Sequence, residues 1–269
     1  MRNIIVSFAV ALLALTLVPP AAIAEKPKQD DHQVDLAVGK ALYDQYVEND
    51  LIVDDSPYLP ILKSVGARVA RASGRQWFIE RFFVVRGNQL NAISAPGGYV
   101  FVYEGLLRSA DNVDELANVL GHETAHLVLG HTMAKRAQDQ RKDLFFKIGH
   151  AFVNESSKGS QNTYNVATSA GTYTFLNYSR QQEYAADQFG AQLAAKAGYN
   201  PYGSIWYFRS VVKLQGDAGT FEPYVQQHPS NSDRIARMET FIHQNAALFG
   251  SWKNRMTSTS GLPRVASRG

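Results

Sequence analysis

One helix, predicted from Val113 to Leu127, constrains the fold more than any other part of the chain. Its valine and leucine residues recur at helical spacing, which indicates that most of the helix is buried. The same helix nevertheless carries His122, Glu123 and His126. Because a buried imidazole or carboxylate is costly without a partner, the fold must bring other polar groups or an ion to this helix.

These three residues form the pattern H-E-x-x-H, whose spacing suits a metal ion. Residues four apart lie about 40° from each other around a helix, so His122 and His126 can reach one Zn²⁺ ion per chain. Glu123 is then expected to act as a general base on zinc-bound water, whose pKa zinc lowers to about 7. An ordinary amphipathic helix is the alternative, and it leaves these polar groups among apolar neighbours unexplained.

A catalytic zinc site needs a third protein ligand. The extended pattern with glycine at position 129 and histidine at position 132 is excluded, because Leu129 and Thr132 stand there. His131 lies five residues beyond His126, about 140° around a continuous helix, and is expected to point away from the ion.

Glu183 is the better candidate for the third ligand. Glu183 and Asp187 lie four apart on a helix predicted from Tyr178 to Lys196, so they share one face. Glu183 would leave an open position for water, and Asp187 would accept a hydrogen bond from a ligand histidine. Taken alone, however, the pair fits a solvated acidic face beside Arg180 better than a metal site.

The rest of the chain predicts one α+β domain. Helices are expected at residues 34–53, 61–70, 204–214 and 235–249, and strands at residues 78–85, 90–94 and 99–103. Asp111 or Asn112 can cap the histidine helix, which either ends at Gly130 or continues through Met133. Residues 154–171 are rich in small polar residues and are predicted to form a loop that gates the cleft.

The first 24 residues have the composition of a signal peptide. Arg2 precedes an apolar run from Ile4 to Val18, and Ala22 to Ala24 give the small-x-small pattern of a cleavage site before Glu25. The alternative is an uncleaved membrane anchor. A helix that spans a membrane needs about 20 apolar residues, and this run is shorter. We expect a periplasmic or secreted protein with a domain at residues 25–256, a disordered tail at 257–269 and no transmembrane helix once the signal is removed.

Charge and cysteine content exclude several classes of function. Lysine and arginine number 27 against 24 aspartate and glutamate residues, a surplus too small to favour nucleic acid as the main partner. The chain has no cysteine. Disulfides, a cysteine nucleophile, a thiolate metal site and a lipid on an N-terminal cysteine are therefore excluded.

Further short motifs surround the histidine helix in a specific order. They are Asn91-Ala92, the segment from Pro96 to Val102, Gly105-Leu106-Leu107, Glu115-Leu116-Ala117, the segment from Glu183 to Asp187, His228-Pro229 and Arg234-Ile235. Together they cover most of residues 34 to 245. This ordered set resembles the HtpX-like zinc metallopeptidases, which are related to the CAAX prenyl proteases, and within that family the soluble envelope branch.

The resemblance implies a mainly helical, gluzincin-type domain with a small β-sheet over the zinc helix. It implies that His228 and Arg234 lie near the active site, where His228 approaches the metal and Arg234 stabilises the oxyanion. It also implies an edge strand that pairs with an extended substrate backbone. The residues of that strand are Gly98, Tyr99, Val100 and Phe101.

The sequence as a whole predicts a zinc-dependent endopeptidase that cleaves unfolded or misassembled envelope proteins, with envelope assembly proteins as further partners. A zinc-containing chaperone or adaptor that binds polypeptides without cleaving them is the alternative from another class. Glu123 argues against it, since a purely structural metal site needs no base. A metal-free helical scaffold is the third hypothesis, and it predicts no stoichiometric zinc after dialysis.

Overall fold

The structure is a computed structural model that describes residues 29–75, 81–132, 178–214, 231–256 and 262–263. The predicted signal peptide, the predicted loop at residues 154–171, His228 and most of the predicted tail lie outside these residues. None of the described helices is long and apolar enough to cross a membrane.

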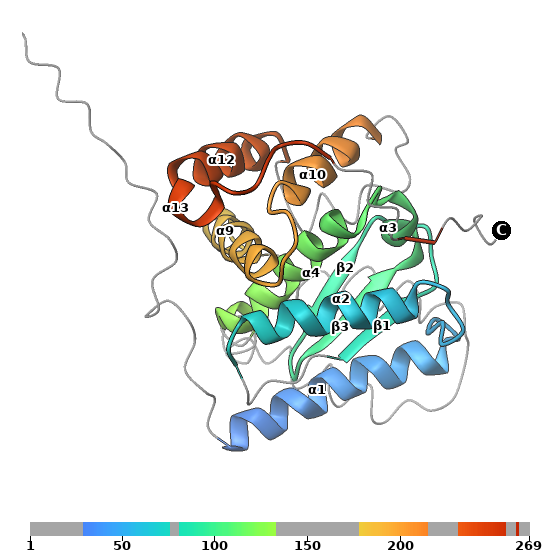
Figure 1. Ribbon diagram of the computed structural model, residues 1–269. Helices are drawn as coiled ribbons and strands as arrows, with labels where there is room; N and C mark the ends of the chain where they lie inside the picture. The colour runs from blue at the N-terminus through green and yellow to red at the C-terminus, as the bar shows by residue number, and fades with distance from the viewer. Residues whose placement is uncertain (1–28, 76–80, 133–177, 215–230, 257–261, 264–269) are drawn as a thin grey trace, which may run out of the picture.

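Helices dominate the described chain and surround one small sheet (Figure 1). In chain order the elements are α1 (Gln29–Glu48), α2 (Leu59–Ala72), β1 (Arg81–Val85), β2 (Ala92–Ala95), β3 (Tyr99–Tyr103), α3 (Glu104–Ser109), α4 (Val113–Val128), α9 (Arg180–Lys196), α10 (Gly203–Leu214), α12 (Asn231–Gln244) and α13 (Ala246–Phe249). This arrangement confirms the predicted α+β class. The first helix begins and ends five residues earlier than predicted, and it ends before Asp50, whose φ of 55° cannot continue a right-handed helix.

The sheet has the strand order β1-β3-β2. Strand β3 is parallel to β1 and antiparallel to β2, with Phe101 opposite Phe83 on one side and Ile93 on the other. Side chains alternate between the two faces of the sheet, as strand geometry requires. One face, which includes Val100 and Val102, joins the core formed with α2 and α4, and the other packs its aromatic side chains against α1.

The position of β3 corrects the prediction that Gly98, Tyr99, Val100 and Phe101 form an edge strand. Gly98 precedes β3, and the other three residues belong to it. Strand β3 is the central strand and pairs with a neighbour on each side. The turn before β3 folds it back on β2, while β1 joins its other side from earlier in the chain. The outer strands of the described sheet are therefore β1 and β2, and residues 51–53 bond to the outer edge of β1 through the Val53 amide and the Leu51 carbonyl.

Helix α4 lies in the middle of the molecule, between the sheet and α9 (Figure 1). Asn112 is its N-cap, and its side-chain oxygen accepts a hydrogen bond from the Glu115 amide at 3.0 Å. The Glu115 carboxylate accepts in turn from the Asp111 amide at 3.0 Å. The helix ends at Val128, and Gly130, at φ 72°, turns the chain away.

Two glycines allow α4 and α9 to approach each other closely. A Cβ atom on Gly121 would lie 2.5 Å from the carbonyl oxygen of Gly190. A Cβ atom on Gly190 would lie 2.7 Å from the amide nitrogen of His122. Both distances are too short for real atoms, and both obstacles are backbone, which cannot rotate away. This contact therefore sets how near α9 comes to the histidines of α4.

We predict that Gly190→Ala destabilises the fold by about 1–3 kcal/mol, because the added methyl forces α4 and α9 apart. In an unconstrained helix the same change would stabilise by up to about 1 kcal/mol. Urea unfolding followed by circular dichroism measures the difference. Gln181→Ala, on an exposed position of the same helix, is the matched control and should change stability by less than about 0.5 kcal/mol. A Gly190→Ala protein as stable as wild type would show that the helices are not locked by this contact.

Candidate metal centre

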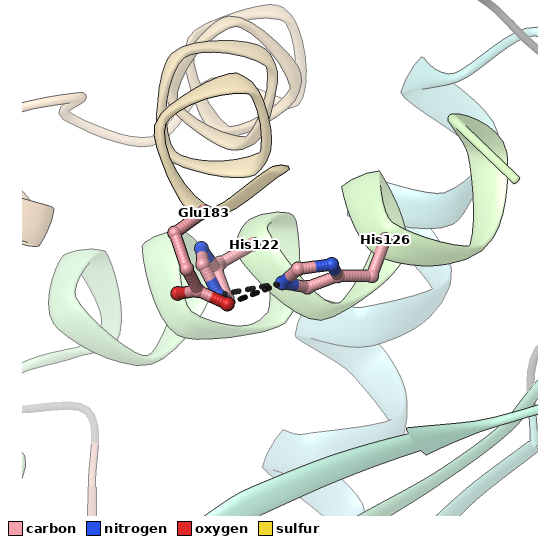
Figure 2. Close-up of side chains that lie close together, drawn as sticks. All are labelled: His122, His126 and Glu183. Carbon is pink, nitrogen blue, oxygen red and sulfur yellow. Dashed lines mark hydrogen bonds and ion pairs between the residues drawn. The ribbon is translucent and has the colours of Figure 1, made fainter. Parts of the chain in front are cut away.

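Two helices bring three metal-ligating side chains to one point. His122 and His126 lie one turn apart on α4, and Glu183 lies in the first turn of α9. One ligand atom from each of the three residues lies within 4.8 Å of the other two. Figure 2 shows both imidazoles turned toward the Glu183 carboxylate. All three side chains are buried.

The distances between these atoms fit a zinc ion. The two Nε2 atoms are 3.0 Å apart, and the Glu183 oxygens lie 3.5 Å from Nε2 of His122 and 3.4 Å from Nε2 of His126. Ligand atoms about 2.0–2.2 Å from a tetrahedral zinc ion lie about 3.3–3.6 Å from one another. Both carboxylate distances fall in this range, whereas the two Nε2 atoms lie closer together than it requires. The residues present therefore fit the metal that the H-E-x-x-H pattern predicts, with two imidazoles and one carboxylate as donors.

Asp187 lies behind His122, one turn beyond Glu183 on α9. Its Oδ1 is 2.9 Å from Nδ1 of His122, which leaves Nε2 of that ring facing the other two donors. Arg234 of α12 donates two hydrogen bonds to the Asp187 carboxylate, at 2.6 and 2.7 Å. The guanidinium also lies 3.4 Å from Glu183 and over the ring of Phe208. A buried ion pair thus stands directly behind the candidate ligands.

The charges around His122 favour a cation at this point. Burial alone would lower the pKa of His122, but the Asp187 and Glu183 carboxylates outweigh burial and raise it. Burial alone would likewise raise the pKa of Asp187, but Arg234 holds it below its usual range. Both carboxylates therefore supply negative potential to the space between the three donors, where a metal ion would be stabilised.

The ring of His126 is held on two sides. Tyr178 stacks on it with ring centroids 3.8 Å apart and planes 16° apart. His131 places its Nδ1 3.0 Å from Nδ1 of His126. Burial lowers the pKa of His126 to about 4 and that of His131 to about 3, so both rings are neutral at pH 7. Burial also raises the pKa of Tyr178, so its phenol keeps its proton.

His131 lies beside His126, on the Nδ1 side of that ring, a contact that the sequence did not predict. The predicted direction of His131 assumed a continuous helix, whereas α4 ends at Val128 and the chain turns at Gly130. The turn returns His131 to the side of His126. Neither His131 nor Tyr178 was assigned to the site from the sequence. Gly130 was the signal for His131, since a glycine after the last apolar residue of a helix favours such a turn.

Glu123 lies next to the candidate ligands and is 3% exposed. It lines a cavity together with His122, Ala92 of β2, Leu106 of α3 and Phe208 of α10. The cavity therefore joins the predicted base to the sheet edge and to apolar side chains. Asp187 and Arg234 also border this cavity. His228, which was predicted to approach the metal, lies outside the described residues.

Comparisons with known proteins agree with this geometry. The sequence model of peptidase family M48 matches residues 60–242. The chain is similar to mitochondrial metalloendopeptidase OMA1 of Schizosaccharomyces pombe, with 30% identity over 175 residues, which are 65% of this chain and 50% of that protein. The human mitochondrial metalloendopeptidase OMA1 is 29% identical over 220 residues, 75% of this chain and 41% of that protein.

A third relative is the beta-barrel assembly-enhancing protease of Escherichia coli strain K12. It is 23% identical over 190 residues, which are 69% of this chain and 39% of that protein. The chain thus spans half or less of the length of these three relatives.

We predict that Arg234→Met destabilises the fold by about 3–5 kcal/mol, because it leaves Asp187 buried without its counter-ion. The double variant Arg234→Met with Asp187→Leu should recover part of this loss, since neither charge then remains. Urea unfolding in the presence of a chelator separates the effect from any metal binding. A loss below about 1 kcal/mol for Arg234→Met would mean that the pair does not support the site.

Proposed function

We propose that this chain, which belongs to peptidase family M48, is a zinc-dependent endopeptidase whose metal is held by His122, His126 and Glu183. The observation that carries the proposal is the convergence of two imidazoles from α4 and a carboxylate from α9 within 4.8 Å. Two imidazoles and one carboxylate leave an open position on a tetrahedral ion, as hydrolysis requires. A metal that only stabilises the fold is normally closed by four protein ligands.

In this proposal Glu123 is the general base and acid. A bound zinc ion supplies a Lewis acid that activates water and polarises the scissile carbonyl. Glu123 takes a proton from the attacking water and delivers it to the leaving amine nitrogen. Its burial beside His122 limits competition from bulk water for that proton.

Arg234 and Asp187 act through His122 in this proposal. Asp187 lies 2.9 Å from Nδ1 of His122 and, by accepting its proton, keeps Nε2 free for the metal. Arg234 holds Asp187 with two hydrogen bonds. Because its guanidinium is committed to Asp187 and packed over Phe208, this geometry favours a positioning role for Arg234 over the oxyanion contact expected from the sequence.

We further propose that an extended substrate pairs with the free edge of β2. Among the described residues, β2 pairs with β3 alone. The Tyr103 amide donates to the Asn91 carbonyl at 3.0 Å, and hydrogen-bonded pairs alternate along an antiparallel ladder. Ala92 and Ser94 therefore turn their own N–H and C=O groups away from β3. Ala92 also borders the cavity that contains Glu123, so an added strand would pass the base.

The substrate class follows from this mode of binding and from analogy. Pairing by backbone hydrogen bonds requires an extended, locally unfolded polypeptide. One relative is named for enhancing β-barrel assembly. By analogy we propose that unfolded or misassembled envelope proteins are the substrates, that envelope assembly proteins are further partners, and that residues 1–24 direct export to the periplasm.

The central test compares Glu123→Gln with Glu183→Ala. Glu123→Gln should retain one zinc ion per chain and lose at least about 100-fold in cleavage of a denatured protein, because only the base is removed. Glu183→Ala should lose both zinc and cleavage, because two histidines remain. Bound zinc is measured after exhaustive dialysis, and fragments are identified by mass spectrometry.

Wild-type turnover by a zinc-loaded Glu123→Gln protein would refute the role of Glu123. If the wild-type protein binds denatured polypeptide and zinc but produces no fragments, the chaperone or adaptor hypothesis is correct instead. A wild-type protein without stoichiometric zinc would favour the metal-free scaffold.

The proposed substrate edge predicts a specific effect of proline. Ala92→Pro removes an outward N–H without removing a hydrogen bond to β3, so the fold and zinc content should persist. Cleavage should fall by about 2- to 10-fold, the value of one lost backbone hydrogen bond. Ile93→Pro is the matched control, because it removes a bond within the sheet and should destabilise the fold itself. Unchanged cleavage by a folded Ala92→Pro protein would place the substrate elsewhere.

A further inference from the structure

The two candidate histidine ligands have different hydrogen-bond partners at Nδ1. For His122 the nearest partner is the Asp187 carboxylate, 2.9 Å away, with the Arg234 guanidinium at 3.4 Å. For His126 it is Nδ1 of another histidine, His131, 3.0 Å away. The ring centroids of His126 and His131 are 5.1 Å apart with planes at 65°, so the two rings meet edge to face and do not stack.

The turn after α4 brings His131 into contact with His126. Helix α4 ends at Val128, and its C-cap at Leu129 is followed by Gly130 in the left-handed region at φ 72°. A residue with a Cβ atom is strained in that conformation. The turn places His131 beside the last imidazole of α4, although a continuous helix would direct it about 140° away.

The chemistry of a ligand histidine defines what this contact does. A histidine that binds a metal through Nε2 is neutral and carries its proton on Nδ1. His126 is fully buried, so an Nδ1–H without an acceptor would cost about 1–3 kcal/mol. His131 offers a lone pair on Nδ1 at hydrogen-bond distance, provided that its own proton lies on Nε2.

We propose that His131 is a positioning residue whose Nδ1 accepts a hydrogen bond from Nδ1–H of His126. This bond fixes the tautomer and the direction of that metal ligand. This inference rests on the proposed zinc site. Tyr178, stacked 3.8 Å from the His126 ring, fixes the plane of the imidazole, and His131 fixes its rotation within that plane. Tyr178 and His131 thus orient the His126 ring, as Asp187 and Arg234 orient the His122 ring.

The neutral character of His131 suits the charge balance of the site. Glu123, Glu183 and Asp187 already place three carboxylates near the ion, against Arg234 as the buried cation beside them. A fourth carboxylate behind His126 would leave excess negative charge in a buried site. An imidazole satisfies the same hydrogen bond without adding charge.

The test compares His131→Asn with His131→Leu in the full chain. The asparagine oxygen can take the place of Nδ1 as acceptor, whereas leucine has similar bulk and no acceptor. Zinc affinity is measured by competition with a chromophoric chelator, and circular dichroism checks the fold. We expect His131→Leu to weaken zinc binding by about 10- to 100-fold and His131→Asn to restore most of the loss. Equal losses in both variants would reduce His131 to a packing residue and overturn the proposal.

A second measurement determines the tautomers directly in the wild-type protein and uses a variant only to assign signals. In zinc-loaded protein with ¹⁵N-labelled histidine, His126 should show a proton on Nδ1 that exchanges slowly with solvent, and His131 should show its proton on Nε2. His126 is assigned by the change of its Nδ1–H signal in His131→Asn. A zinc-loaded protein in which His131 carries its proton on Nδ1 contradicts this inference alone. A wild-type protein that binds no zinc contradicts the proposed function and this inference with it.

Discussion

The close contact between α4 and α9 is the constraint on which the site depends. Gly121 and Gly190 let the two helix backbones meet where any Cβ atom would collide. That approach brings Glu183 to the Nε2 atoms and Asp187 to Nδ1 of His122. A carboxylate is short, so even a small separation of the helices would take it out of reach of the imidazoles. The candidate metal centre therefore depends on helix packing as much as on the identity of its ligands.

Burying so many polar groups around one point costs free energy, which interactions within the site have to offset. Arg234 neutralises Asp187 and lies near Glu183, while Tyr178 and His131 enclose His126 without adding charge. The remaining negative charge faces the space between the ligands. A divalent cation there would offset it, which explains why a protein tolerates these groups in its core. The same enclosure limits the access of bulk water to Glu123, the proposed base, and strengthens electrostatic interactions within the site.

The sequence predicted the local parts of this arrangement better than the non-local ones. Spacing within one helix was sufficient to group the histidines of α4 and the carboxylates of α9, because helix geometry repeats along the chain. Strand order was not readable in the same way. The segment of β3 was recognised as a strand, but its central place depends on parallel pairing with β1, which precedes β2 in the chain. The contact of His131 with His126 was not predicted, because the angle of about 140° between them applies to a continuous helix, whereas the chain turns at Gly130. The partner of Arg234 was not predicted, since its pairing with Asp187 joins residues 47 apart.

The most direct test of the account is the position of the metal itself. A crystal of the zinc-loaded protein, with diffraction data collected on both sides of the zinc absorption edge, would give an anomalous map that locates the ion. The account predicts one peak per chain, about 2.0–2.2 Å from Nε2 of His122, Nε2 of His126 and a Glu183 oxygen. A peak bound by other residues, or no peak between α4 and α9 in zinc-loaded protein, would contradict it.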